Sequence, residues 1–166
     1  MAENCYLTQR EMLWGLIGRQ DPRPILVKAH PRDTDPASRE RLARMARRHP
    51  KMQLVDANIH DMIAACDVVV TINSATGIEA MLHKKPVVLC GQSDFHHAAV
   101  TCHAAPDLDA AIARAEAWHA PHVPFLWWYF AQNCLSARSP TLVNDFLARV
   151  AATGYDVAAL GLSRGD

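Results

Sequence analysis

Neither sign of charge is in excess in this sequence of 166 residues, which contains 17 Lys and Arg residues and 17 Asp and Glu residues. This balance argues against a general nucleic-acid binder or membrane-surface binder. No apolar run approaches the roughly 20 residues that a transmembrane span needs. The start, Met1-Ala2-Glu3-Asn4, lacks the basic and apolar regions of a signal peptide. These absences favour a cytoplasmic protein, with peripheral attachment at the inner face of the membrane as a second location.

Several motifs of nucleotide binding and catalysis are also absent. There is no GxxxxGK[ST] loop and no GxGxxG after the first predicted strand, and Ser74 lacks the flanking glycines of GxSxG. The five cysteines are widely spaced and form no CxxC pair, which favours reduced thiols over a disulfide framework or a zinc site. We therefore expect no metal and no cofactor.

Short apolar segments alternate with helical segments along most of the chain. The segments that read as strands cover residues 25–30, 52–55, 67–72, 86–90 and 100–102, and those that read as helices cover 7–19, 37–48, 58–66, 75–84, 107–118, 125–135 and 141–153. Continuous apolar strands are typical of a parallel sheet covered on both faces. The pattern predicts an α/β, Rossmann-like domain over residues 1–154, with a parallel sheet of about five strands, helices on both faces and a frayed tail at 155–166.

Polar residues follow several of these strands, and the carboxyl ends of parallel strands meet at one edge, where ligands bind. After the third strand, the hydroxyls of Ser74 and Thr76 and the free N–H groups of a helix start suit a phosphate, and Glu79 can accept hydrogen bonds from a ribose. Lys28 and His30 lie on one face of the first strand, where both can contact the same phosphate. The candidate binding residues are Lys28, His30, Pro31, Asn73, Ser74, Ala75, Thr76, Gly77, Glu79 and His96.

A plainer interpretation of these residues stays open. Ser74 can be an ordinary helix cap with Glu79 complementing the helix dipole, and Lys28 can extend its ammonium into solvent. The sequence assigns no catalytic residue.

Three segments in this order resemble the capsular polysaccharide biosynthesis proteins, which are related to bacterial β-Kdo transferases that use CMP-Kdo. They are Lys28-Ala29-His30-Pro31-Arg32-Asp33, the stretch from Asp67 through Asn73-Ser74-Ala75-Thr76-Gly77-Ile78-Glu79-Ala80, and Lys84-Lys85-Pro86-Val87-Val88. The resemblance implies the C-terminal, nucleotide-sugar-binding lobe of a GT-B glycosyltransferase. It further implies that His30 and the loop from Ser74 to Thr76 face the CMP phosphate, with Glu79 near the ribose or sugar.

The resemblance implies a lobe that binds a CMP-sugar donor, with CMP-Kdo as the first candidate, in capsule or surface polysaccharide synthesis. Its expected partners are a nucleotide-sugar donor, a saccharide or glycolipid acceptor, and an N-terminal lobe, without which the chain is expected to be inactive.

The segment Phe125-Leu126-Trp127-Trp128-Tyr129-Phe130 holds more large apolar residues than one helix face buries, so it predicts a contact with that lobe or with a second subunit. A helix within the domain's own core is the alternative. Two other functions remain open: a non-catalytic binding or assembly module, and a UDP-sugar epimerase-like protein.

Overall fold

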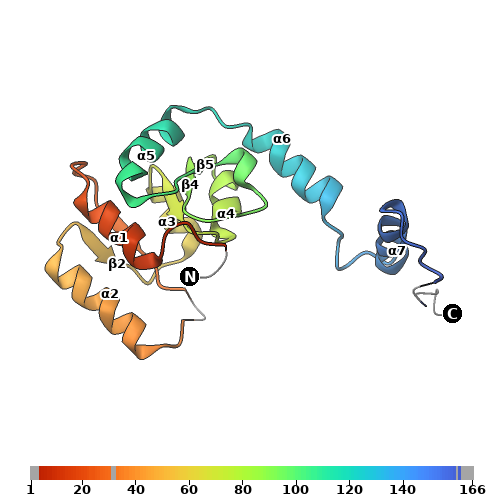
Figure 1. Cartoon of the computed structure of the whole chain (residues 1–166), viewed down its shortest axis with the longest axis horizontal. Helices are drawn as coiled ribbons and strands as arrows, with labels where there is room; N and C mark the ends of the chain where they lie inside the picture. The colour runs from red at the N-terminus through yellow and green to blue at the C-terminus, as the bar shows by residue number, and fades with distance from the viewer. Residues whose placement is uncertain (1–3, 31–32, 160, 162–166) are drawn as a thin grey trace. The chain divides into compact units, whose positions relative to one another are not determined.

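The computed structural model describes residues 4–30, 33–159 and 161. Pro31, the first three residues and part of the predicted tail (160 and 162–166) lie outside the described residues. The chain divides into two compact units, Met1–Val123 and Pro124–Asp166 (Figure 1). The first unit contains every strand of the described chain.

All the strands predicted from the sequence are present, and all pair in parallel. β1 (Ile25–Val27) pairs with β2 (Met52–Leu54), while β3 (Val69–Thr71), β4 (Val87–Leu89) and β5 (Val100–Thr101) form a second sheet in the order β3-β4-β5. This arrangement confirms the Rossmann-like α/β fold class.

The strands form two sheets, whereas the sequence predicted one. Side chains link β1 to β3 where the backbone does not. Ile25 packs against the same apolar cluster as Val68 and Val70, and Arg23 forms an ion pair of 3.3 Å with Asp67. The starts of the two strands therefore lie together, although the structure gives no ladder of hydrogen bonds between them in the described chain.

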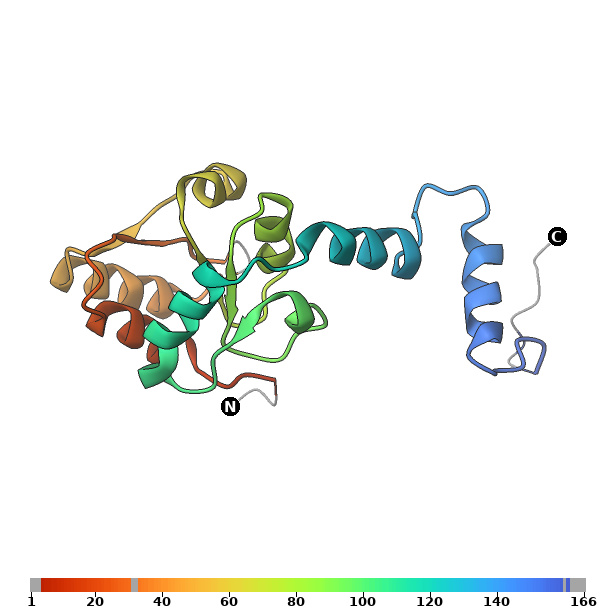
Figure 2. The same cartoon turned by 90° about the horizontal axis from the view of Figure 1, so that it is seen from above.

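Helices cover both faces of the three-stranded sheet, as predicted. Val88 and Cys90 belong to a buried cluster with Leu16 of α1 (Gln9–Gly18) and Ile112 of α5 (Leu108–Ala117). Successive residues of a strand point to opposite faces. Val87 accordingly faces α4 (Thr76–Leu82), since its Cγ1 lies 3.4 Å from where a Cβ on Gly77 would lie. Figure 2 shows the ribbons of α4 and α5 on different sides of this sheet.

The two-stranded sheet has a separate apolar cluster beneath two helices. Leu13 of α1, Leu42 of α2 (Pro36–Arg48) and Met52 of β2 form its buried part, against which Val27 packs. α3 (Ile59–Ala65) follows β2, and the short 3₁₀ turns η1 (His96–Ala98) and η2 (Ala105–Asp107) flank β5. α1 thus contributes to both clusters, because Leu16 packs in the first and Leu13 in the second.

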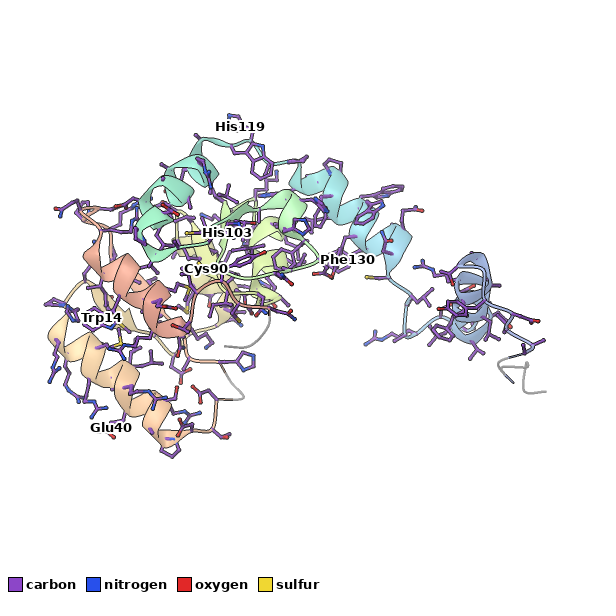
Figure 3. All side chains as sticks on the ribbon, in the orientation of Figure 1. Trp14, Glu40, Cys90, His103, His119 and Phe130 are labelled. Atoms are coloured by element: carbon purple, nitrogen blue, oxygen red, sulfur yellow. The ribbon has the colours of Figure 1, made fainter. Side chains whose placement is uncertain are left out.

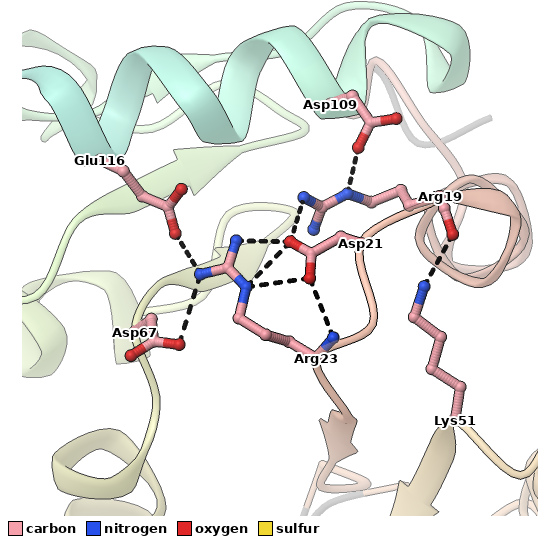
Figure 4. Close-up of polar contacts among 7 residues, drawn as sticks. All are labelled: Arg19, Asp21, Arg23, Lys51, Asp67, Asp109 and Glu116. Carbon is pink, nitrogen blue, oxygen red and sulfur yellow. Dashed lines mark hydrogen bonds and ion pairs between the residues drawn. The ribbon is translucent and has the colours of Figure 1, made fainter.

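Six charged side chains join the amino ends of β1 and β3 to α5 and to the end of α1 (Figure 4). Arg23 contacts Asp21, Asp67 and Glu116, while Arg19 contacts Asp21 at 2.9 Å and also Asp109 of α5. Hydrogen bonds from Arg23 hold the pKa of Asp21 well below its usual range, so this carboxylate stays ionised. The network joins the residues before β1 and a residue before β3 to α5. It lies at the amino edge of the strands, so the opposite, carboxyl edge is formed by the loops.

The helix α6 (His122–Trp127) continues as a π-helix, η3 (Trp128–Asn133), and α7 (Leu142–Ala152) follows. Trp127, Trp128 and Phe130 expose 62%, 49% and 46% of their surface, so the described chain buries this apolar segment only in part. No helix among the residues the structure describes is long and apolar enough to cross a membrane.

Candidate functional site

A cavity opens at the carboxyl edge of β4 and β5, and an N-terminal segment forms one of its sides. The N–H groups of Tyr6 and Leu7 donate to the carbonyl of Cys90 at 3.0 Å, and the N–H of Gln92 donates to the carbonyl of Asn4 at 2.8 Å. The cavity has a volume of about 680 Å³ and is lined by Asn4, Tyr6, Gly91, Gln92, Ser93, Asp94, His96, Thr101 and His103. We call it the edge cavity.

Most residues that line the edge cavity carry neutral hydrogen-bonding groups, and Asp94 adds a carboxylate. Nδ1 of His96 lies 2.8 Å from the carbonyl oxygen of Ser93, and the ring of His103 lies 4.2 Å from the ring of Tyr6, centroid to centroid. His103 follows β5, and Cys90 directly follows β4, which ends at Leu89 (Figure 3). Hydroxyls, an amide and imidazoles can both donate to and accept from a ligand rich in hydroxyl groups.

Among the predicted binding residues that the structure describes, His96 alone lines this cavity. Asn4, Tyr6 and His103 were missed, because no sequence signal shows that the N-terminal segment pairs with the end of β4. Their positions depend on hydrogen bonds between segments that lie far apart in the sequence.

The predicted phosphate loop after β3 closes on itself. The N–H of Thr76 donates to Ser74 Oγ at 3.2 Å, the N–H of Gly77 donates to the Ser74 carbonyl at 3.0 Å, and the Glu79 N–H donates to the Ala75 carbonyl at 3.2 Å. The expectation that these N–H groups stay free for an anion is therefore wrong. A short hydroxyl side chain next to the backbone competes for such donors, which accounts for the closed turn.

Side-chain groups and one amide remain accessible on this loop. Asn73 and Ala75 are exposed, and Ser74 and Thr76 are half-buried with their hydroxyl oxygens 3.1 Å apart. The Ala75 N–H and the half-buried Glu79 carboxylate have no hydrogen-bond partner within the described chain. An anion at this loop would thus meet mainly hydroxyl groups.

The loops after β3 and β4 pack directly against each other. A Cβ on Gly77 would lie 2.5 Å from Cε2 of Phe95, and one on Gly91 would lie 2.9 Å from Cγ2 of Ile72. Both glycines are needed for this close approach, because any side chain would fill the space. The structure thus brings the loop of Ser74 beside the segment that carries His96.

β1 belongs to the other sheet and ends at Val27, so the prediction that Lys28 and His30 lie on one face of this strand is wrong: both follow it in the loop. Nζ of Lys28 donates to the carbonyl of Ala57 at 2.6 Å and lies 3.5 Å from Asp56 Oδ1, so it holds the loop after β2. His30 is exposed, next to residues outside the described chain. A shared contact of these two residues with the loop of Ser74 stays a prediction.

The buried cysteines Cys90 and Cys102 offer no activated nucleophile at this edge. Burial raises the pKa of the Cys90 thiol to about 12 and also raises the pKa of Cys102. Both thiols stay protonated at neutral pH, and the thiolate is the reactive form. Within the described residues, no three His, Cys, Asp or Glu side chains are arranged to hold a metal ion.

Comparison with known proteins gives one family. A family model described as capsule polysaccharide biosynthesis protein matches residues 9–121, which is more than half of the chain. The match covers all the strands and the helices α1 to α5. No curated protein and no solved structure matches the chain. The chain therefore belongs to the capsule polysaccharide biosynthesis family, as its sequence predicted, and its role is in capsule synthesis.

Proposed function

We propose that this chain is the donor-binding lobe of a GT-B glycosyltransferase and that it binds a CMP-sugar, with CMP-Kdo as the first candidate. One observation carries the proposal: a cavity of about 680 Å³, lined by polar side chains, opens at the carboxyl edge of parallel strands. Ligands of open α/β sheets bind at this edge. Membership of a capsule synthesis family makes an activated sugar the ligand of first choice.

The donor's phosphate is assigned to the loop after β3 and to the end of β1. Since the N–H groups of Thr76, Gly77 and Glu79 are already bonded, side chains supply most of the contacts: the hydroxyls of Ser74 and Thr76, the imidazole of His30 and the ammonium of Lys28. Donors aimed at the departing phosphate stabilise the charge that develops there. Lys28 contributes a point charge, while its Nζ keeps its hydrogen bond to the Ala57 carbonyl.

The sugar is assigned to the edge cavity beside this loop. Gln92, Ser93 and Thr101 offer neutral donors and acceptors for hydroxyl groups, and His96 borders the same space. The packing of Phe95 against Gly77 joins the two parts of the proposed site, because it fixes one loop against the other.

Calorimetric titration with CMP, CMP-Kdo and a UDP-sugar tests the proposal. We expect binding of the cytidine nucleotides and none of the UDP-sugar. A preference for uridine would support the epimerase-like alternative. Binding of none of the three ligands would contradict the proposal and favour an assembly module with the same fold.

Two substitutions test the assigned residues. His30→Ala and Ser74→Ala should each weaken CMP binding by about 1–3 kcal/mol, the cost of losing a hydrogen bond to a charged group. His119→Ala is the control, because this exposed histidine lies after α5 and outside the lining of the edge cavity. Unchanged affinity in both His30→Ala and Ser74→Ala would remove the phosphate assignment.

A further inference from the structure

A second hollow lies between α1 and α2, on elements that do not form the edge cavity. Its volume is about 250 Å³, and its lining includes Arg10 and Trp14 from α1 and Arg41, Arg44 and Arg48 from α2. Trp14 is labelled in Figure 3. We call this hollow the α1–α2 groove.

Positive charge is concentrated along the groove although the whole chain has no net charge. Arg41, Arg44 and Arg48 follow one another at spacings of three and four residues, which places them in one stripe about 10 Å long on a helix. Arg10 adds a guanidinium from the facing helix. An arginine stripe of this kind suits carboxylate or phosphate groups.

Internal acidic residues neutralise this charge only weakly. Arg41 lies 3.4 Å from Asp35 and Arg44 lies 3.6 Å from Glu40, and both are exposed pairs of the kind that contributes little. Within the described chain, Arg10 and Arg48 have no ion-pair partner. The groove therefore keeps positive charge available for an outside ligand.

Trp14 adds a flat apolar surface beside the guanidinium groups. Its side chain is 44% exposed, and its ring meets the ring of His49 edge-on, with the centroids 5.0 Å apart. Leu13 and Leu42 are buried at the base of the groove. Cations next to an exposed aromatic ring suit a ligand that has both acid groups and apolar ring faces.

The packing of α2 argues against a lipid bilayer as the ligand. Leu42, Met45 and Ala46 face inward and pack around Met52, so α2 has no apolar face left to insert into a membrane. An interfacial helix needs such a face. A concave groove also fits a narrow ligand better than a broad surface.

We propose that the α1–α2 groove binds a negatively charged saccharide with carboxylate or phosphate groups. The proposal rests on the proposed function only for the substrate class, since an enzyme of capsule synthesis handles saccharides. The groove and the edge cavity share no lining residue, so the two sites can be tested separately.

The test is a titration of the full chain with trigalacturonate as the charged probe and maltotriose as the neutral probe. We expect trigalacturonate to bind, added NaCl to weaken the binding, and maltotriose not to bind. Arg48→Gln should weaken trigalacturonate binding about tenfold, the effect of losing one charge-assisted hydrogen bond. Trp14→Ala should weaken it as well.

Arg47→Gln is the matched control. It removes the same charge from the neighbouring exposed position of α2, but Arg47 does not line the groove. We expect a change of less than about twofold in this variant, as for a distant surface charge. Equal losses in Arg47→Gln and Arg48→Gln would overturn the proposal, because they would show a diffuse charge effect. Absence of trigalacturonate binding together with Arg48-dependent binding to phosphatidylglycerol vesicles would also overturn it.

A parallel titration with CMP separates this proposal from the proposed function. Arg48→Gln should leave CMP affinity unchanged. Binding of trigalacturonate without any CMP binding would support the groove and refute the donor site. CMP binding without trigalacturonate binding would refute the groove alone.

Discussion

Gly77 shows how one missing side chain sets the position of a loop. A Cβ at this residue would lie 2.5 and 2.8 Å from two ring atoms of Phe95. The side chain of Phe95 is only 3% exposed, so its ring has little room to move. Gly77→Ala should therefore lower the free energy of unfolding by about 1–3 kcal/mol, the range for overpacking. Gly18→Ala is the control, since nothing lies within 4 Å of its added carbon and alanine favours a helix.

Urea denaturation of both variants measures the difference. A Gly77→Ala protein as stable as the parent would mean that the Phe95 ring moves aside without cost. The loops after β3 and β4 would then not hold each other in place.

His122 is the residue expected to make stability depend on pH near neutrality. Its side chain is 8% exposed, and its Nε2 has no hydrogen-bond partner within the described chain. Burial lowers the pKa of His122, although a hydrogen bond with the Ala98 backbone opposes this. The folded state thus binds fewer protons than the unfolded state, so stability is complete above the usual value of 6.5 and falls as the pH drops below it.

Free energies of unfolding measured between pH 7 and pH 5 test this expectation. His122→Asn cannot titrate, so its stability should decline less over this range than that of the parent. The lowered pKa of Asp21 acts in a separate window, because its stabilising effect is lost only below about pH 4. An equal decline in parent and variant would assign the pH dependence to other groups.

At the scale of elements, the charged network at the amino edge joins parts that no backbone ladder joins. Asp21 is 16% exposed and accepts hydrogen bonds from the side chains of Arg19 and Arg23 and from the Arg23 N–H. Asp21→Asn should lower the free energy of unfolding by about 1–3 kcal/mol, because two guanidinium groups lose their shared carboxylate. Glu40→Gln, which breaks the exposed pair with Arg44, should change it by less than about 0.5 kcal/mol.

Urea denaturation curves of these two variants provide the comparison. If both variants lose the same small amount, the network contributes no more than a surface ion pair. The apolar packing of Ile25 would then be enough to hold β1 beside β3 without the ion pairs.

The sequence predicted these elements well because each has a local signal. Pro36 and Asp35 mark the start of α2, and Asp35 accepts hydrogen bonds from Ala37 and Ser38 as a helix cap does. The β-branched run before Asn73 gives β3 in the same way. Patterns within one segment are enough for such features.

Features that depend on two distant segments could not be predicted. The pairing of Tyr6 with Cys90 forms a side of the edge cavity, yet neither segment encodes its partner. The separation of β1 from β3 depends on backbone alignment that apolar periodicity does not specify. The closed turn at Ser74 was missed for another reason: a hydroxyl can cap a helix or close a turn, and the sequence allows both.

At the scale of the whole molecule, the buried core is confined to the first unit. The buried apolar residues of the described chain run from Leu7 to Ala115, and α7 buries none. A chain ending at Val123 should therefore keep a midpoint of thermal unfolding within a few degrees of the full chain, and should keep its affinity for CMP. Circular dichroism and calorimetry measure both, and a large loss of stability would show that the second unit supports the core.

The second unit presents apolar surface that its own residues do not cover, and we expect another polypeptide to bind there. Trp127 and Trp128 are 62% and 49% exposed, and an exposed apolar patch usually marks a contact surface.

The full chain should self-associate as its concentration rises, whereas Trp127→Ala and the chain ending at Val123 should not. Trp118→Ala is the matched control, because Trp118 is 40% exposed but belongs to the first unit. Sedimentation equilibrium distinguishes the outcomes. Association that persists in Trp127→Ala or disappears in Trp118→Ala would place the contact elsewhere, and a full chain that stays monomeric would leave a different polypeptide, such as a second lobe, as the partner to test.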